Sequence, residues 1–214
     1  TLSYEPDIEI AIATDTYTAY ISPYCFDSEG NNITDVSLSV YRREFDGSFT
    51  EIATSVETDA NTYIIDPHPS LDLANYRIVA TDIDNGSISY TDIPGYFVGI
   101  RSIIIQWDET WSTLEVLGED PLEKVTWAGS MLKLPYNIDV SDSNTKDVSL
   151  IEYIGRSHPV SYYGTQLGVT ATWNTDIPKS DKNTIYGLRS LAIYAGDVYV
   201  REPSGSGYWD NISV

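Results

Sequence analysis

The first 98 residues repeat a two-residue alternation of apolar and polar side chains, interrupted at short intervals by turn sequences. Ile8, Ile10 and Ile12 alternate with Glu9 and Ala11, and later segments repeat this pattern. A period of two places every second side chain on the same face of an extended strand. Turn-forming sequences end the runs, among them Asp46-Gly47, Asn85-Gly86 and Pro94-Gly95. Seven short strands separated by such turns predict an antiparallel β-sandwich of the immunoglobulin-like kind.

The composition agrees with a mainly β chain that has no covalent cross-link. The sequence holds 17 Tyr and 5 Trp but one Met, and aromatic residues favour strands. Its single cysteine, Cys25, cannot form an intramolecular disulfide, and we expect it to be a small buried apolar side chain. The longest apolar run, residues 99–105, has the length of a strand. No membrane insertion is expected from a run this short.

Acidic residues outnumber basic residues by 32 to 12, which gives a net charge of −20. Residues 1–98 hold 17 acids and 3 bases, a balance of −14, whereas residues 99–214 hold 15 acids and 9 bases, a balance of −6. Binding to nucleic-acid phosphates requires clustered Lys and Arg, so we expect no direct nucleic-acid binding. The charge is expected to keep the protein soluble. An alternative interpretation is a surface that repels nucleic acid passing nearby.

No spacing of residues predicts an active site, a metal site or a bound cofactor. Both histidines, His68 and His158, adjoin proline and lie outside metal-binding and nucleophile motifs, and His68 is expected to be a loop residue. The polar segment 139–147 lacks the spacing of an EF-hand and predicts a solvated loop. We therefore predict a protein that is not an enzyme. A glycoside hydrolase, which needs two suitably placed carboxylates, is the less favoured alternative.

Residues 99–214 predict a second, β-rich domain with one helix, and Pro94–Gly99 marks the expected boundary between the two domains. The helix is expected at about residues 181–195, with Ser180 as its N-cap and Gly196 after its last turn. Its expected apolar stripe follows helical spacing and consists of Ile185, Leu188, Ala192 and Ala195, with Leu191 beside it. Strands are expected on both sides of this helix, the last two joined by a turn over residues 202–207.

Three segments of residues 150–214 carry a resemblance to a known class of proteins. The first is a strand-pair motif, the second is the helix, and the third is a hairpin motif; the motif residues are Gly155, Arg156, Pro159, Val160, Tyr163 and Gly164, then Arg201, Glu202, Pro203 and Gly205. In this order the segments resemble bacteriophage virion proteins of the tail and baseplate, whose tail-tube and distal-tail domains are β-sandwiches with one flanking helix. Residues 1–98 resemble fibronectin type III domains in length and strand pattern, and the segment from Leu71 to Tyr76 resembles their corner between sheets.

The resemblance implies a structural subunit of the virion tail, made in the cytoplasm of the bacterial host. It implies assembly into an oligomeric ring or tail-tip complex, with itself and other tail or baseplate proteins as partners. The candidate assembly residues are Arg156, His158, Tyr162, Tyr163, Arg201 and Trp209. The alternative is a carbohydrate-binding or adhesion module that contacts a host glycan, in which Trp111 stacks on a sugar.

Overall fold

The computed structural model describes residues 5–56, 62–111, 115–116, 128–135, 138–151 and 160–214. Antiparallel strands dominate these residues and one helix accompanies them, which confirms the predicted fold class. The chain divides into two compact units, Thr1–Pro135 with Lys182–Val214, and Tyr136–Asp181. The division therefore differs from the predicted boundary near residue 98, because strands from both sides of that boundary belong to the first unit. No described helix is long and apolar enough to span a membrane.

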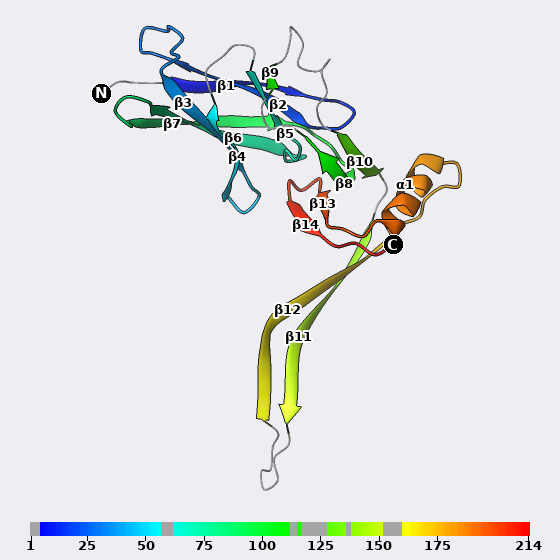
Figure 1. Cartoon of the computed structure of the whole chain (residues 1–214). Helices are drawn as coiled ribbons and strands as arrows, with labels where there is room; N and C mark the ends of the chain where they lie inside the picture. Colours follow the sequence, from blue (N-terminus) through cyan, green and yellow to red (C-terminus); the bar gives the residue numbers. More distant parts are fainter. Residues whose placement is uncertain (1–4, 57–61, 112–114, 117–127, 136–137, 152–159) are drawn as a thin grey trace. The chain divides into compact units, whose positions relative to one another are not determined.

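Strands β1 to β7 lie within the residues predicted for the sandwich and, together with the short β9 from beyond residue 98, form its two sheets (Figure 1). One sheet has the order β1-β2-β5-β9, with strands β1 (Glu5–Ile12), β2 (Ala19–Phe26), β5 (Thr62–Asp66) and the short β9 (Glu115–Val116). The other has the order β4-β3-β6-β7, with strands β4 (Phe49–Val56), β3 (Val36–Arg43), β6 (Leu73–Asp82) and β7 (Ile88–Phe97). Sequential strands thus change sheets between β2 and β3, between β4 and β5, and between β5 and β6, as they do in immunoglobulin-like sandwiches.

The core of the sandwich follows directly from the alternation in the sequence. Every second residue of β3 and β6 is buried, including Leu38 and Ile78, and the residues between them are more exposed. Ile8 and Ile21 fill the same core from the facing sheet. Cys25 is fully buried among these residues, as expected, and burial raises the pKa of its thiol to about 11. The thiol therefore stays protonated at neutral pH.

A third sheet completes the first unit. Its order is β10-β8-β13-β14, with strands β10 (Ala128–Leu134), β8 (Ile103–Thr110), β13 (Val198–Arg201) and β14 (Gly207–Asp210). The predicted turn over residues 202–207 joins β13 to β14: the amide of Glu202 donates to the carbonyl of Ser206 at 2.8 Å. Gly205 has φ +93° in this turn, a conformation that glycine adopts without strain.

Helix α1 (Lys182–Ile193) packs against β10 and begins close to the predicted residue. A Cβ atom at Gly187 would lie 2.7 Å from Cδ1 of Leu132, so the glycine permits close packing of helix and strand. The predicted apolar stripe is partly wrong. Thr184 and Leu191 are buried, whereas Ala192 and Ala195 are exposed. The buried side is defined by contact with β10 and includes a glycine and a threonine, which an apolar pattern does not select.

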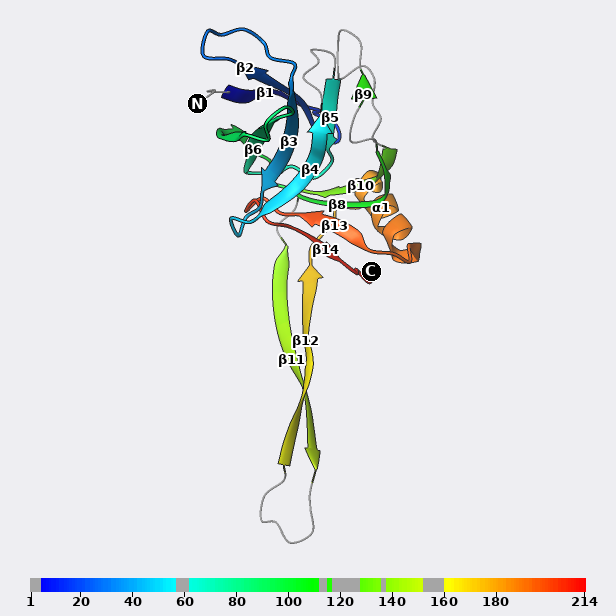
Figure 2. The ribbon, with the colours of Figure 1, turned by 60° about the vertical axis from the view of Figure 1, so that its left-hand side comes forward.

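The second unit contains a two-stranded antiparallel ribbon of β11 (Asp139–Ile151) and β12 (Val160–Asn174). Figure 2 shows the pronounced twist of this ribbon, which is typical of two-stranded sheets. The register pairs Asp139 with Asn174 and shifts between Lys146 and Val148, where β12 carries extra residues. The predicted loop at residues 139–147 is therefore wrong. Pairing with β12 satisfies the backbone of this polar segment and does not require apolar side chains.

Candidate functional site

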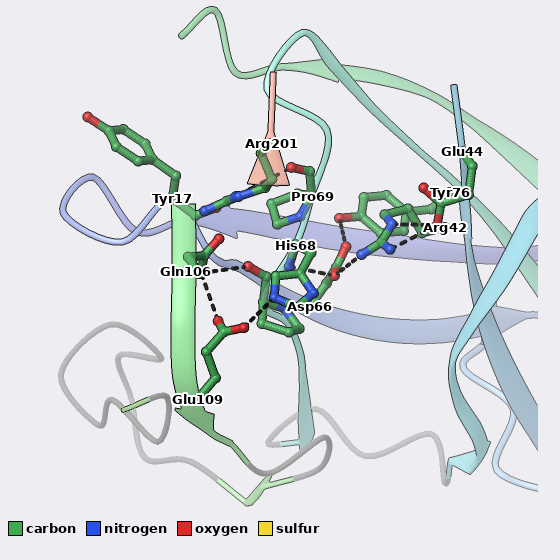
Figure 3. A network of polar contacts seen from close by, with 11 residues as sticks. Tyr17, Arg42, Glu44, Asp66, His68, Pro69, Tyr76, Gln106, Glu109 and Arg201 are labelled. Carbon is green, nitrogen blue, oxygen red and sulfur yellow. Dashed lines mark hydrogen bonds and ion pairs between the residues drawn. The ribbon is translucent and has the colours of Figure 1, made fainter. Parts of the chain in front are cut away.

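The connection between β5 and β6 enters the interior of the first unit and carries the polar centre shown in Figure 3. Its residues Asp66, Pro67, His68 and Pro69 are all buried. A proline on either side of His68 restricts the backbone and removes two amide donors that would otherwise need partners. His68 is a loop residue, as expected, but its ring lies inside the protein.

Asp66 is the first centre of this network (Figure 3). Its Oδ1 accepts from Nη1 of Arg42 at 2.6 Å and from the amide of His68 at 3.0 Å, and its Oδ2 accepts from the hydroxyl of Tyr76 at 2.8 Å. Arg42 also donates from Nε and Nη2 to Glu44. Burial opposes the charge of Arg42, but Asp66, Tyr199 and Glu44 outweigh it and raise the pKa of the guanidinium. The three side chains of Arg42, Asp66 and Tyr76 thus bind strands β3, β5 and β6 together.

His68 is the second centre. Its Nε2 lies 2.7 Å from Oε2 of Glu109 on β8, and Nε2 of Gln106 donates to the other oxygen of Glu109 at 2.9 Å. Burial lowers the pKa of His68, while the hydrogen bond and charge of Glu109 oppose this shift. The imidazole is therefore neutral at pH 7 and donates its Nε2 proton to the carboxylate. This contact joins the sandwich to the third sheet.

Aromatic rings surround the His68 imidazole. Tyr199 of β13 stacks on it with ring centroids 3.8 Å apart, and Trp111 and Trp209 meet it edge-on at 5.7 and 5.6 Å. The structure therefore brings together Trp111 and Trp209, two residues selected from the sequence for separate reasons. Trp209 remains 57% exposed, and one side of the cluster is accessible.

Arg201 is the second buried arginine of this region. Its side chain is 1% exposed, and its Nη1 and Nη2 donate to the carbonyls of Tyr17 and Thr16 at 2.9 and 3.0 Å. Burial lowers its pKa to about 10, so the guanidinium is still charged at neutral pH. Tyr17 occupies the left-handed region with φ 54°, and this turn presents its carbonyls to the arginine. Arg201 was selected as an assembly residue, but the structure places it inside the chain.

The network serves to hold two sheets in a fixed relation. Two buried arginines lie near two buried carboxylates, Asp66 and Glu109, and the partly exposed carboxylate of Glu44 also pairs with Arg42. Among the described residues, no hydroxyl or thiol forms a hydrogen bond with the His68 ring. Paired charges with several hydrogen bonds fix side-chain geometry, and removal of one member leaves another unpaired.

A polar cleft of about 240 Å³ lies near this network, between the β3–β4 turn, the start of β6 and the β13–β14 turn. Its lining includes an exposed aromatic ring and several polar side chains, namely Arg43, Glu44, Phe45, Asp72, Asn75 and Ser204. Phe45 is 71% exposed, whereas Glu44 is bound to Arg42. The cleft combines one exposed aromatic ring with hydrogen-bonding groups, and it is smaller and more polar than most sites for small ligands.

The remaining candidate residues belong to the second unit. Arg156 and His158 lie outside the described residues. Tyr162 and Tyr163 lie on β12, paired with Ser149 and Val148 of β11. Among the residues that the structure describes, no cluster of His, Cys, Asp and Glu could hold a metal ion.

Of the buried network, only Arg201 was selected from the sequence as a candidate site residue. The selection missed Asp66, His68, Glu109 and Tyr199, together with Arg42, Tyr76 and Gln106. One feature of the sequence could have indicated this network: an aspartate and a histidine stand beside two prolines. Proline restricts the backbone of such a segment. Comparison of the sequence with protein-family models and with curated proteins found no match.

Proposed function

We propose that this chain is a non-enzymatic structural subunit of a bacteriophage tail or baseplate. It assembles through protein–protein contacts into an oligomeric ring or tail-tip complex. Its partners are copies of itself and other virion proteins, and it is made in the cytoplasm of the bacterial host before it joins the tail.

The ribbon of β11 and β12 is the observation that carries this proposal. Its strands have 13 and 15 residues, and at about 3.3 Å per residue β12 spans roughly 50 Å. No third strand among the described residues joins the ribbon. A two-stranded sheet is marginally stable alone, and its unpaired edges readily accept strands of another chain. A long ribbon of this kind is expected to gain its stability from a partner.

The first unit supports the proposal in a different way. Its buried network joins the sandwich to the third sheet through Arg42, Asp66, His68, Glu109 and Arg201, and so gives a rigid body. Rigid subunits are suited to symmetric assemblies because each contact must repeat with the same geometry. The helix and the hairpin at Arg201 follow each other in the order that the virion-protein resemblance implies. The net charge of −20 also disfavours adhesion to DNA that passes through a tail.

Light scattering coupled to size-exclusion chromatography tests the proposal, together with mass spectrometry of purified virions. We expect the intact chain to form discrete oligomers and to be a stoichiometric virion component. Replacement of residues 139–174 by a short Gly-Ser linker should leave the first unit folded but abolish or reduce oligomer formation. A chain that is strictly monomeric and absent from virions would contradict the proposal.

The polar cleft favours a second candidate function, the carbohydrate-binding or adhesion module. Phe45 is exposed at the cleft and can stack on a sugar, whereas Trp111 is edge-on to His68 and is half-buried. Binding to a host-surface glycan that is lost in Phe45→Ala, with unchanged thermal unfolding, would support this function. Turnover of that glycan, lost in Asp72→Asn, would instead support the glycoside-hydrolase alternative.

A further inference from the structure

The two outer faces of the sandwich differ in their charged residues. On strand β1, Glu5, Asp7 and Glu9 are exposed and the residues between them are buried, so three carboxylates follow one another on one face. We call these three residues the acidic face. Residues 1–98 hold three basic residues, of which one is the buried arginine of the network. The other two, Arg43 and Arg77, both lie on the outer side of the opposite sheet. Arg43 is paired with Phe49 of β4, and Arg77 is paired with Tyr41 of β3.

Arg77 is held in a stack of rings on that opposite sheet. Its guanidinium lies over the ring of Phe49 at 4.3 Å and over the ring of Tyr90 at 4.5 Å. Its Nε and Nη2 donate to the two carboxylate oxygens of Asp92 at 2.6 and 2.8 Å. Phe49 and Tyr90 nevertheless remain 40% and 61% exposed. We call the set Arg43, Phe49, Arg77, Ile88 and Tyr90 the arginine–aromatic face.

The arginine–aromatic face has the features of a protein-binding surface. Tyrosine and arginine are enriched where binding energy concentrates, and a side chain fixed before binding loses less entropy on association. Arg77 is fixed by three neighbours from strands β4 and β7. Ile88 is 68% exposed at the end of β7 and adds apolar area. Large apolar side chains exposed together on one sheet face mark sites of interaction.

The strand positions of the charged residues have similar spacing on the two faces. Arg43 is opposite Asn75, two residues before Arg77 on the neighbouring strand, so the two arginines form a diagonal pair. Such a pair is separated by about 7–8 Å. Glu5 and Asp7 are two residues apart on one strand, which corresponds to about 7 Å. Among the described residues, Arg43 forms no ion pair within the chain.

We propose that the arginine–aromatic face of one copy docks on the acidic face of a second copy. This inference rests on the proposed function as a self-assembling subunit, and it places a contact between copies on the sandwich in addition to any contact made by the ribbon. Copies of a chain with charge −20 repel one another. This face carries both basic residues of 1–98 that lie outside the buried network, the exposed Arg43 and the partly exposed Arg77, which is paired with Asp92. Its approach to the acidic face therefore meets less repulsion than the approach of two acidic faces would. The two faces are different surfaces, so the contact is heterologous and repeats from copy to copy into a ring or a filament.

A charge exchange on the full chain tests the proposal. One variant carries Arg43→Glu and Arg77→Glu, and the other carries Glu5→Lys, Asp7→Lys and Glu9→Lys. Each variant alone places like charges on both faces, so we expect at least a tenfold weaker self-association by analytical ultracentrifugation. In a mixture of the two variants, opposite charges face each other again, and association should return to within about threefold of the original protein. Raised salt should weaken the original association.

The matched control carries Arg101→Glu and Arg189→Glu, which make the same change of charge at exposed positions outside this face. Arg189 also lies over an aromatic ring, that of Tyr186 at 5.8 Å, so the control removes a comparable contact. Its self-association should be unchanged within about twofold. Thermal unfolding of each variant checks that the fold is intact.

Three outcomes would overturn the proposal. Oligomers that persist in both single variants but disappear when the ribbon is replaced would place self-assembly on the ribbon, and the proposed function would stand. Weakened association that the mixture does not restore would show that the two faces do not meet. A monomeric original protein would overturn the inference, and its presence or absence in virions would decide separately on the proposed function.

Discussion

Two arginine–aspartate pairs of the same sandwich have the same shortest contact distance and opposite surroundings. Arg42 meets Asp66 with Nη1 and Oδ1 2.6 Å apart, and the side chains are 6% and 0% exposed. Arg77 meets Asp92 with Nε and Oδ1 also 2.6 Å apart, but the side chains are 30% and 58% exposed. The shortest contact distance therefore does not distinguish the two pairs. They differ in burial, and the exposed pair has two hydrogen bonds where the buried pair has one.

This difference in burial separates stability from recognition. Inside the protein, each member of the Arg42–Asp66 pair depends on the other, because water cannot replace a lost partner. At the surface, water and salt replace the partner readily, so the Arg77–Asp92 pair contributes little to folding. The exposed pair instead orients a guanidinium between two rings, where a second molecule can reach it. Each variant below tests one side of this contrast.

The largest expected effect is that of Asp66→Asn, which removes the carboxylate but keeps the size of the side chain. Arg42 would lose its buried counter-charge, and removal of one partner of a buried pair costs about 3–5 kcal/mol. Urea unfolding followed by tryptophan fluorescence measures this loss. Asp92→Asn is the matched control at the exposed pair. If both variants lowered the free energy of unfolding equally, burial would not explain the difference between the two pairs.

Arg201→Met should have the second-largest effect. The carbonyls of Thr16 and Tyr17 would lose their donors, at about 1–3 kcal/mol for each buried group left unsatisfied. Release of a buried charge offsets part of this cost, as the lowered pKa of Arg201 indicates. We expect a net loss of about 2–3 kcal/mol by urea unfolding. Arg189→Met on the exposed side of α1 should leave the unfolding midpoint unchanged.

The pH dependence of unfolding reports the state of His68. Burial lowers its pKa in the folded protein below the ordinary value of 6.5, so the unfolded chain binds a proton first as the pH falls. This contribution to stability is present above pH 6.5 and is lost progressively as the pH decreases toward the lowered pKa. The original protein should lose stability between pH 7 and pH 5 relative to His68→Gln. His158→Gln should retain the pH dependence of the original protein. If the stability of His68→Gln changed with pH in the same way as that of the original protein, His68 would not be the source of the pH dependence.

The smallest expected effect is that of Asp92→Asn on folding itself. Its carboxylate is exposed, and the hydrogen bonds from Arg77 lower its pKa. Removal of the charge leaves no buried group without a partner, because water can reach Arg77. The unfolding midpoint should stay within experimental error, and any shift should disappear in high salt. A large shift that salt does not reduce would mean that the exposed pair supports the fold.

The sandwich was predictable from the sequence because one face of each strand is buried and the alternation records it. Val36, Leu38 and Val40 alternate with less buried positions and identify the inner side of β3. The sequence of the ribbon has no comparable alternation in segment 139–147. Segment 139–147 is polar throughout, and a strand whose partner satisfies its backbone does not need an apolar face.

The candidate site was less predictable because its members are remote in sequence. His68 meets Glu109 at a separation of 41 residues, and Arg201 meets Thr16 at a separation of 185. Neither contact follows from local spacing, and an arginine next to a turn reads as a surface residue. Trp111 and Trp209 are candidate residues from the sequence, one for ligand stacking and one for assembly. That both rings contact His68 could be found only in three dimensions.

The paired ends of the ribbon also have a consequence for the order of folding. Residues 136–181 separate β10 from α1 and β13, so pairing of β8 with β13 must close a long segment of chain. A flexible segment of 46 residues, counted from those bounds, would cost about 3 kcal/mol of closure entropy. In the ribbon, Asp139 is paired with Asn174, so the ends of the segment are already neighbours. A hairpin that forms within microseconds can therefore precede the slower pairing of β8 with β13 and raise its rate.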